Sequence, residues 1–151
     1  MLFKLSEAER ESGWEETMAE QGNIEIVRGL YENFREGDID AMLGGMTEDV
    51  EWQLPEIAGV PFSGRRQGHA AVREFFVGVA EMQDVDVMEL NTVVAQGDAV
   101  VVLGRYAWRV KATGRKFASD FAHAFHMADG KVGMFQEFLD TAAAAAAYQG
   151  A

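Results

Sequence analysis

Three histidines and no cysteine limit the side chains that could carry a proton or hold a metal ion in this 151-residue chain. His123 lies in the run SDFAHAFHM, where it alternates with Phe121, Phe125 and Met127. Alternation of this kind is typical of a strand with one buried face, so we expect an imidazole enclosed by aromatic rings. Such a group can accept and release a proton near neutral pH. His126 falls on the more polar face of the same run.

The spacing of the histidines does not indicate a metal site. His69 follows Gly68 at an expected helix start and is predicted to be solvated. None of the three histidines is spaced three or four residues from a second ligand on a carboxylate-rich helix face. We therefore expect no metal ion.

We expect an acidic partner of His123 on the last strand, which follows Asp129 and Gly130. A three-residue loop over 128–130 would place Glu137 on the His123 side, whereas a two-residue Asp-Gly turn would place Gln136 there. A carboxylate beside the imidazole would form a pair able to move a proton. The alternative is a buried polar pair whose hydrogen bond only satisfies both partners.

The preceding strand supplies candidate pocket walls. Its even-numbered residues from Val100 to Val110 include Tyr106 and Trp108 and are predicted to face inward. Tyr106 is a candidate to donate its hydroxyl hydrogen to a carbonyl oxygen, and Trp52 is a candidate wall residue or core filler. The predicted substrate-binding residues are Tyr106, Trp52, Trp108, Phe121 and Phe125.

The surrounding pattern predicts helices followed by a meander. Helical spacing of apolar residues predicts helices over 23–37, 39–46 and 69–82, and a strand begins at Val50 and Trp52. Strands are expected over 86–96, 99–111, 115–127 and 132–139, separated by Gly-containing turns. This order indicates an α+β fold, in which helices cover one face of a curved antiparallel sheet.

Two segments lie outside this regular pattern. Residues 1–22 are expected to be an N-terminal extension, with Ser6 and Glu9 at capping-box spacing in either a short helix or a frayed end, and 23–151 form the domain. Residues 55–68 contain both prolines, so we expect a loop or a broken edge that brings Arg65 and Arg66 to the surface.

Composition narrows the possible partners. The formal net charge of -12 at pH 7 repels phosphate backbones and anionic lipid, so nucleic-acid and membrane binding are not expected. No apolar run approaches the roughly 18 residues that span a bilayer. Acidic residues within 1–20 disagree with a signal peptide, so a cytoplasmic location is expected.

Three segments together resemble the SnoaL-like branch of the nuclear-transport-factor-2-like superfamily over residues 23–148. They are YENFREGDIDAMLGGMTEDVEW, GRRQGHAAVREFF and AFHMADGKVGMFQEFLDTA. The resemblance implies a cone-shaped sheet closed by helices over one apolar pocket. It also implies a catalytic histidine and acid at His123 and Glu137, although the family usually has aspartate at the second position. Members commonly pair through the open sheet face, which here carries Val101, Leu103 and Ala107, so a homodimer is expected.

Related enzyme types match less well. A limonene epoxide hydrolase would need Arg and Asp where this chain has Gly104 and Tyr106, and a ketosteroid isomerase would need carboxylates at Leu54 and His123. The resemblance therefore implies a cofactor-free cyclase or isomerase, which moves a proton next to a carbonyl group of a hydrophobic small molecule. The alternatives are a non-catalytic binding module with the same pocket and a structural dimerisation domain.

Overall fold

A six-stranded sheet in the order β2-β1-β6-β5-β4-β3 forms the frame of the computed structural model, which describes residues 17–150. Its strands are β1 (Met46–Gln53), β2 (Arg65–Gln67), β3 (Gln83–Gln96), β4 (Ala99–Val110), β5 (Lys116–Ala128) and β6 (Lys131–Phe138). The helices in this part of the chain are α2 (Met18–Glu36), α3 (Ile39–Gly44), α4 (His69–Met82) and α5 (Thr141–Tyr148). None of these helices is long and apolar enough to cross a membrane.

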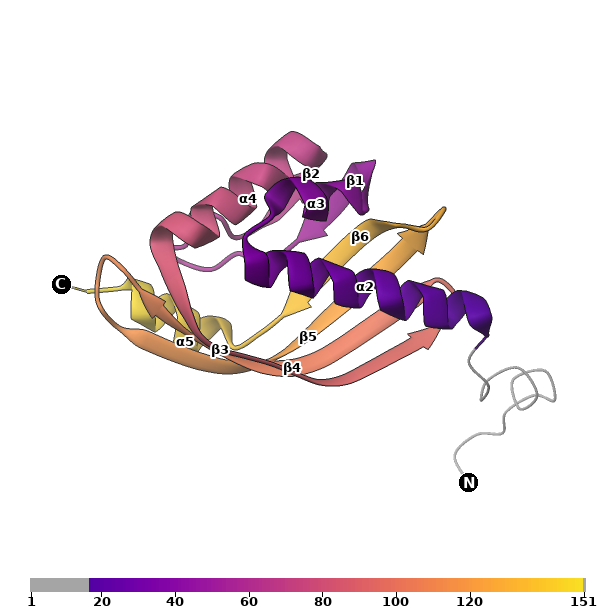
Figure 1. Cartoon of the computed structure of the whole chain (residues 1–151). Helices are drawn as coiled ribbons and strands as arrows, with labels where there is room; N and C mark the ends of the chain where they lie inside the picture. Colours follow the sequence, from indigo (N-terminus) through magenta and orange to yellow (C-terminus); the bar gives the residue numbers. More distant parts are fainter. Residues whose placement is uncertain (1–16, 151) are drawn as a thin grey trace, which may run out of the picture.

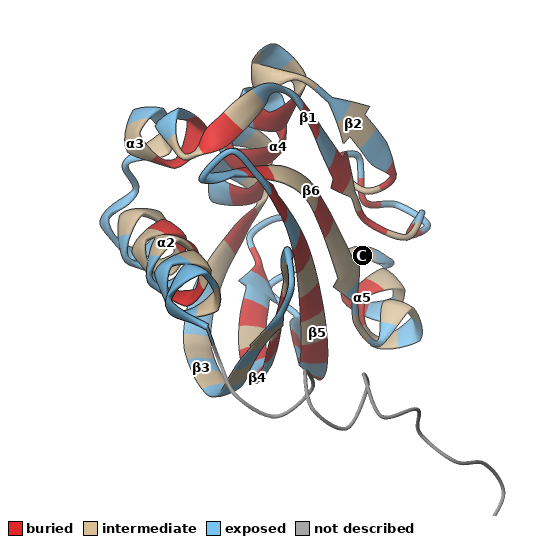
Figure 2. Ribbon diagram, turned by 90° about the vertical axis from the view of Figure 1, so that its right-hand side faces the viewer, coloured by how far each residue is buried: buried red, intermediate tan, exposed pale blue. Residues whose placement is uncertain are grey.

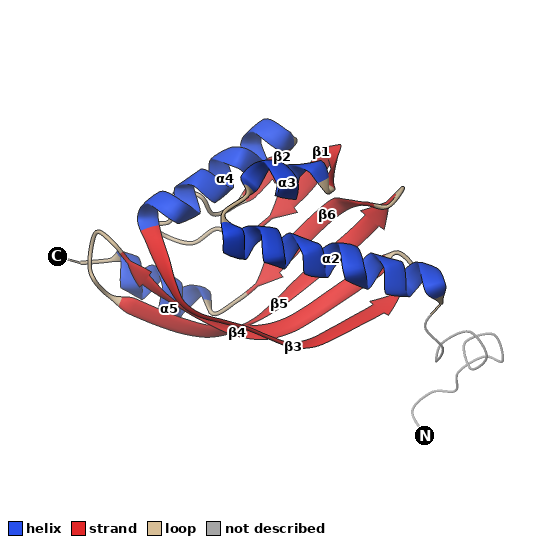
Figure 3. Ribbon diagram, viewed as in Figure 1, coloured by secondary structure: helices blue, strands red, loops and turns tan. Residues whose placement is uncertain are grey.

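The sheet curves strongly, and the helices cover its concave face. Helices α2, α3 and α4 lie over this face, while α5 lies at the end where the chain finishes (Figures 1 and 3). The predicted α+β cone is therefore confirmed. The sheet is only mostly antiparallel, however, because β1 pairs with β6 in parallel. No turn connects these two strands, so alternation in the sequence could not determine their relative direction.

Alternation correctly predicted the inner faces of β4 and β5. Along both strands buried residues alternate with half-buried or exposed ones (Figure 2). Gly104 interrupts the row of large side chains on β4 for a steric reason. A Cβ atom there would lie 2.5 Å from the Phe121 ring and 2.2 Å from the carbonyl oxygen of Glu89. The missing side chain lets the Phe121 ring pack directly against the strand.

Helix α2 begins earlier than expected. Thr17 is the N-cap, and its hydroxyl and the Glu20 carboxylate complete a capping box, so the predicted start at Asn23 is wrong. The Thr-x-x-Glu spacing satisfies free backbone N–H groups in a polar first turn, before the apolar stripe begins. The predicted end is confirmed, since Gly37 adopts φ 72° at the C-cap. The expected helix around Ser6 lies outside the described residues.

Residues 65–67 before α4 form the edge strand β2, which agrees with the expected edge, and Arg65 is exposed as expected. Arg66 differs from the expectation, because only 19% of its side chain is exposed. Its guanidinium donates to the carbonyl oxygen of Ala71 and pairs with Glu74, which compensates part of its burial. His69 is half-buried rather than solvated, because its Nε2 lies 3.1 Å from the carbonyl oxygen of Met46.

The packing of α4 gives a stability prediction. Phe75 is buried, with its ring 5.0 Å from Phe76 and 5.7 Å from Trp52. Phe75→Ala should lower the free energy of unfolding by about 3 to 5 kcal/mol, because it removes a buried ring and leaves a cavity. Urea denaturation followed by circular dichroism measures this change. Val77→Ala on the exposed side of α4 is the control, and equal effects of the two changes would contradict the packing.

Candidate active site

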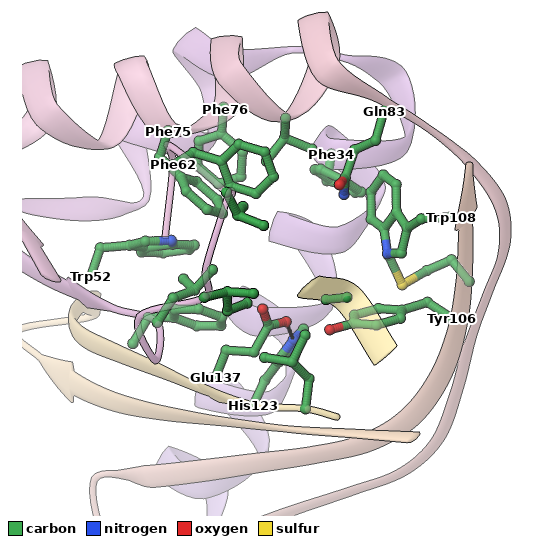
Figure 4. Close-up of a pocket in the computed structure, with 18 of the residues that line it drawn as sticks. Phe34, Trp52, Phe62, Phe75, Phe76, Gln83, Tyr106, Trp108, His123 and Glu137 are labelled. Atoms are coloured by element: carbon green, nitrogen blue, oxygen red, sulfur yellow. Dashed lines mark hydrogen bonds and ion pairs between the residues drawn. The ribbon is translucent and has the colours of Figure 1, made fainter. Parts of the chain in front are cut away.

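An aromatic cavity lies between the concave face of the sheet and the helices. Its volume is about 110 Å³. Most of its wall is built from large apolar side chains of different elements, and His123 and Glu137 enter it from the sheet side (Figure 4). The aromatic wall includes Trp52, Phe75, Phe76, Trp108, Phe125 and Phe135. Polar groups inside such a wall have no bulk water to solvate them, so they must pair with one another.

The β5–β6 hairpin aligns His123 with Glu137 in a way the sequence did not predict. Asp129 and Gly130 form a two-residue connection, with φ 51° and 76°. Alone, that turn would place Gln136 opposite His123. Gly133 is an extra unpaired residue, because Met127 pairs with Val132 while His126 pairs with Met134. This bulge shifts the register by one residue and places Glu137 opposite His123.

His123 joins two other residues in a buried hydrogen-bonded chain. Its Nε2 contacts Oε2 of Glu137, with 8% of the His123 side chain and 12% of the Glu137 side chain exposed. Its Nδ1 lies 2.6 Å from the hydroxyl oxygen of Tyr31 on α2. When Glu137 is ionised and the imidazole neutral, Nε2–H donates to Glu137 and Tyr31 donates to Nδ1. A further proton on Nδ1 would make the ring an imidazolium that donates to both Tyr31 and Glu137, so both nitrogens would stay hydrogen-bonded.

Two tyrosines carry phenol groups at this site: Tyr31, which belongs to the hydrogen-bonded chain, and Tyr106. Burial, with a smaller contribution from the negative charge of Glu137, raises the pKa of Tyr31 and of Tyr106 well above that of a free phenol. Both groups therefore stay protonated near neutral pH and can donate hydrogen bonds. The Tyr106 hydroxyl points toward the part of the cavity that holds Glu137 (Figure 4).

Stacked rings fix the orientation of the imidazole. The Phe121 ring lies between two partners, 4.1 Å from the His123 ring and 4.8 Å from the Tyr106 ring, both in stacked geometry. The Phe135 ring meets the imidazole at 4.9 Å, nearly edge to face. Packing of this kind leaves little freedom for rotation about χ1 and χ2 of His123.

Six of the seven predicted site residues line the cavity, and one does not. The six are His123, Glu137, Tyr106, Trp52, Trp108 and Phe125. Phe121 is buried but does not line it, because its ring packs behind Tyr106 and His123. The indole N–H of Trp52 is buried and has no hydrogen-bond partner among residues 17–150. The roles of all these residues in binding and catalysis stay predictions.

Other polar candidates lie elsewhere. His126 is exposed, as expected, and Asp140 caps α5 by accepting from the backbone N–H of Ala143. Within 17–150 no three His, Asp or Glu side chains are grouped so that they could hold a metal ion.

Tyr31 is the residue that sequence reasoning missed as a site member. Its spacing from Ile24 and Val27 places it on the apolar stripe of the helix. A phenol on a stripe that packs on the sheet was the available signal, since a buried hydroxyl group needs a hydrogen-bond partner. The partner is 92 residues away in the chain, so local spacing could not identify it.

Comparisons with known proteins agree with this architecture. The SnoaL-like domain family matches residues 27–133. An NTF2-like protein from Burkholderia xenovorans is 34% identical, with a TM-score of 0.80 over 88% of this chain and 100% of that one. A second NTF2-like protein, from Burkholderia thailandensis, is 28% identical, with a TM-score of 0.75 over 85% of this chain and 98% of that one.

A third similar structure contains a ligand. It is TerC co-crystallized with polyporic acid, 32% identical, with a TM-score of 0.74 over 85% of this chain and 99% of that one. A comparison with curated proteins finds no match. The family match spans well over half of the sequence, and the cone-shaped sheet has the NTF2-like fold, so this chain belongs to the SnoaL-like domain family.

Proposed function

We propose that this protein is a cofactor-free enzyme that moves a proton next to a carbonyl group of a hydrophobic small molecule, as a cyclase or an isomerase does. The observation that carries the proposal is the Tyr31–His123–Glu137 chain, which is buried in an aromatic cavity. A structural core would favour apolar residues at these positions, because burying a carboxylate is costly even when it is paired.

Glu137 is the proposed base. In the arrangement with a neutral imidazole, both nitrogens of His123 are occupied by protein partners. His123 contacts Oε2 of Glu137, and in the proposal the carboxylate takes a proton from the carbon next to the substrate carbonyl. The electron pair of that C–H bond then forms an enolate.

Tyr106 is the proposed donor to the enolate oxygen. Its raised pKa keeps it protonated, and its hydroxyl points to the region of Glu137. A fixed donor aimed at developing negative charge lowers the barrier without reorganisation of solvent. In an isomerase the proton returns from Glu137 to another carbon. In a cyclase the enolate carbon attacks a second carbonyl of the same molecule, and the new alkoxide takes the proton.

The ligand of TerC supports a carbonyl-bearing aromatic substrate class. Polyporic acid is an aryl-substituted hydroxyquinone, and the aromatic wall of the cavity in this chain is suited to planar rings of that type. At 32% identity the two proteins share a fold, and we propose a similar class of ligand rather than the same compound.

The first functional prediction concerns Glu137. Glu137→Gln keeps the shape of the side chain and an oxygen to accept from Nε2–H, but removes the base. Exchange of the C1 protons of 2-tetralone in D₂O, followed by proton NMR above the buffer rate, should slow by about 10² to 10⁴. The melting temperature should change little.

Glu89→Gln is the matched control, because Glu89 is an exposed carboxylate on the outer side of β3. It should leave the exchange rate unchanged. Wild-type protein that binds 2-tetralone but does not accelerate exchange would contradict catalysis and favour a binding module. Loss of exchange in Glu89→Gln would contradict the assignment of Glu137.

The second functional prediction concerns Tyr31 as a positioning residue. Tyr31→Phe removes the hydroxyl that donates to Nδ1 and should lower kcat for the exchange about tenfold with little change in KM, because the ring no longer holds one tautomer. Imidazole ¹⁵N shifts should show mainly Nε2-protonated His123 in the wild type and a mixture in the variant. Unchanged shifts would refute this role.

We also propose that the protein is a homodimer that pairs through the convex face of the sheet. Leu103, Ala122 and Phe138 are adjacent across β4, β5 and β6. Leu103 is 45% exposed and Phe138 is 52% exposed. Val94 and Val101 extend the patch on β3 and β4. An apolar patch across several strands is unusual on a surface that faces only water.

The oligomeric state tests this proposal. Sedimentation at micromolar concentration should give about twice the monomer mass of 16.6 kDa. Leu103→Asp should shift the protein to monomer, because it places a charge at the centre of the patch. Val77→Asp, at an exposed site on α4, should leave the dimer intact. A wild-type monomer would overturn the proposal.

A further inference from the structure

Gln83 is a second buried polar group in the wall of the cavity. It is the residue at which α4 ends and β3 begins, and its side chain is directed inward from the helix side (Figure 4). Only 7% of the residue is exposed. The Tyr148 hydroxyl donates to its Oε1 over 2.5 Å. Within residues 17–150 the amide nitrogen Nε2 has no hydrogen-bond partner, so both of its N–H donors are free.

Among the buried polar residues, His123 is engaged at both ring nitrogens, and Ser119 accepts from the backbone N–H of Asp140 and donates to a carbonyl oxygen. Gln83 is engaged at its amide oxygen and lines the cavity. A ligand that brings an acceptor oxygen to this part of the cavity could accept a hydrogen bond from Nε2.

Gln83 lies where two hollows of the protein meet, so a long ligand that occupies both would pass beside it. A second hollow of about 340 Å³ lies beside α2, α4 and β3, and it shares Phe34, Trp108 and Gln83 with the inner cavity. The inner cavity of about 110 Å³ is smaller than the roughly 150 Å³ that accommodates benzene. A ligand with more than one ring would therefore need space beyond it, and the second hollow, which also contains Gln83, is adjacent.

We propose that Gln83 determines substrate specificity by donating a hydrogen bond from Nε2 to a second oxygen of the substrate, remote from the carbonyl that lies beside Glu137. The inference rests on the proposed function for the position of the reacting carbonyl. It narrows the substrate class to aromatic ketones that carry a further hydroxyl or carbonyl oxygen on the ring system.

Tyr148 orients this donor. Burial raises the pKa of Tyr148 to about 12, so its hydroxyl stays a donor and occupies the oxygen of the Gln83 amide. With the Tyr148 hydroxyl donating to Oε1, the amide nitrogen is left for the ligand. Phe62 packs edge to face against the Tyr148 ring and supports it.

A set of matched ketones tests the proposal. Isothermal titration calorimetry is carried out with 2-tetralone and with its 5-, 6- and 7-hydroxy derivatives, on the wild type and on Gln83→Leu. The wild type should bind at least one hydroxy derivative about tenfold more tightly than 2-tetralone, as expected for one additional hydrogen bond. Gln83→Leu should lose that preference, so that it binds each hydroxy derivative about as tightly as it binds 2-tetralone.

Two further variants separate the proposal from a structural effect. Gln83→Glu keeps the size of the side chain but has no N–H donor when ionised, so it should also lose the preference. Tyr148→Phe keeps the amide but releases it, so part of the preference should remain. Circular dichroism confirms that each variant is folded.

The outcomes distinguish this proposal from the proposed function. Absence of a Gln83-dependent gain with every derivative overturns the role of Gln83, even when 2-tetralone exchange is catalysed. A Gln83-dependent gain without catalysed exchange supports recognition by Gln83 and counts against the enzymatic function instead.

Discussion

The enclosure of a carboxylate and an imidazole in an aromatic cavity is the constraint on which this structure depends. Neither group is stable there alone, because the surrounding rings offer no substitute for water. Glu137 and His123 satisfy each other, and the second imidazole nitrogen requires Tyr31 from α2. The sheet and its covering helix are therefore joined by one polar chain inside an apolar core. Any shift of α2 along the sheet would leave a buried nitrogen without a partner.

Strand register makes that chain possible. The side chains of β5 and β6 alternate between the two faces, so a slip of one residue would exchange Glu137 for Gln136. The extra residue at Gly133 corrects the register that the two-residue Asp129-Gly130 connection would otherwise impose. On β4, Gly104 leaves space for Phe121, which in turn stacks on His123. Gly133 thus sets the register that aligns Glu137 with His123, and Gly104 leaves room for the ring that stacks on the imidazole.

The sequence was informative where a feature depends on neighbouring residues and was not where it depends on distant ones. Alternation on β4 and β5 predicted their inner faces, and Gly37 predicted the end of α2. Glu137 was the favoured partner of His123, but the expected three-residue loop is not the cause, since a bulge that follows a shorter turn gives the same pairing. The contacts of Tyr31 with His123 and of Gln83 with Tyr148 join residues far apart in the chain. Helical or strand periodicity contains no information about such partners.

The protonation states divide the roles within the proposed reaction. Burial keeps Tyr31 and Tyr106 protonated near neutral pH, so neither phenol can remove a proton from carbon. His123 has both ring nitrogens engaged. The carboxylate of Glu137 is then the proposed base in this part of the cavity. Gln83 enters the cavity from the helix side, opposite Glu137 on the sheet side (Figure 4). In the proposed reaction a substrate that contacts both residues must therefore span the space between the sheet and the helices.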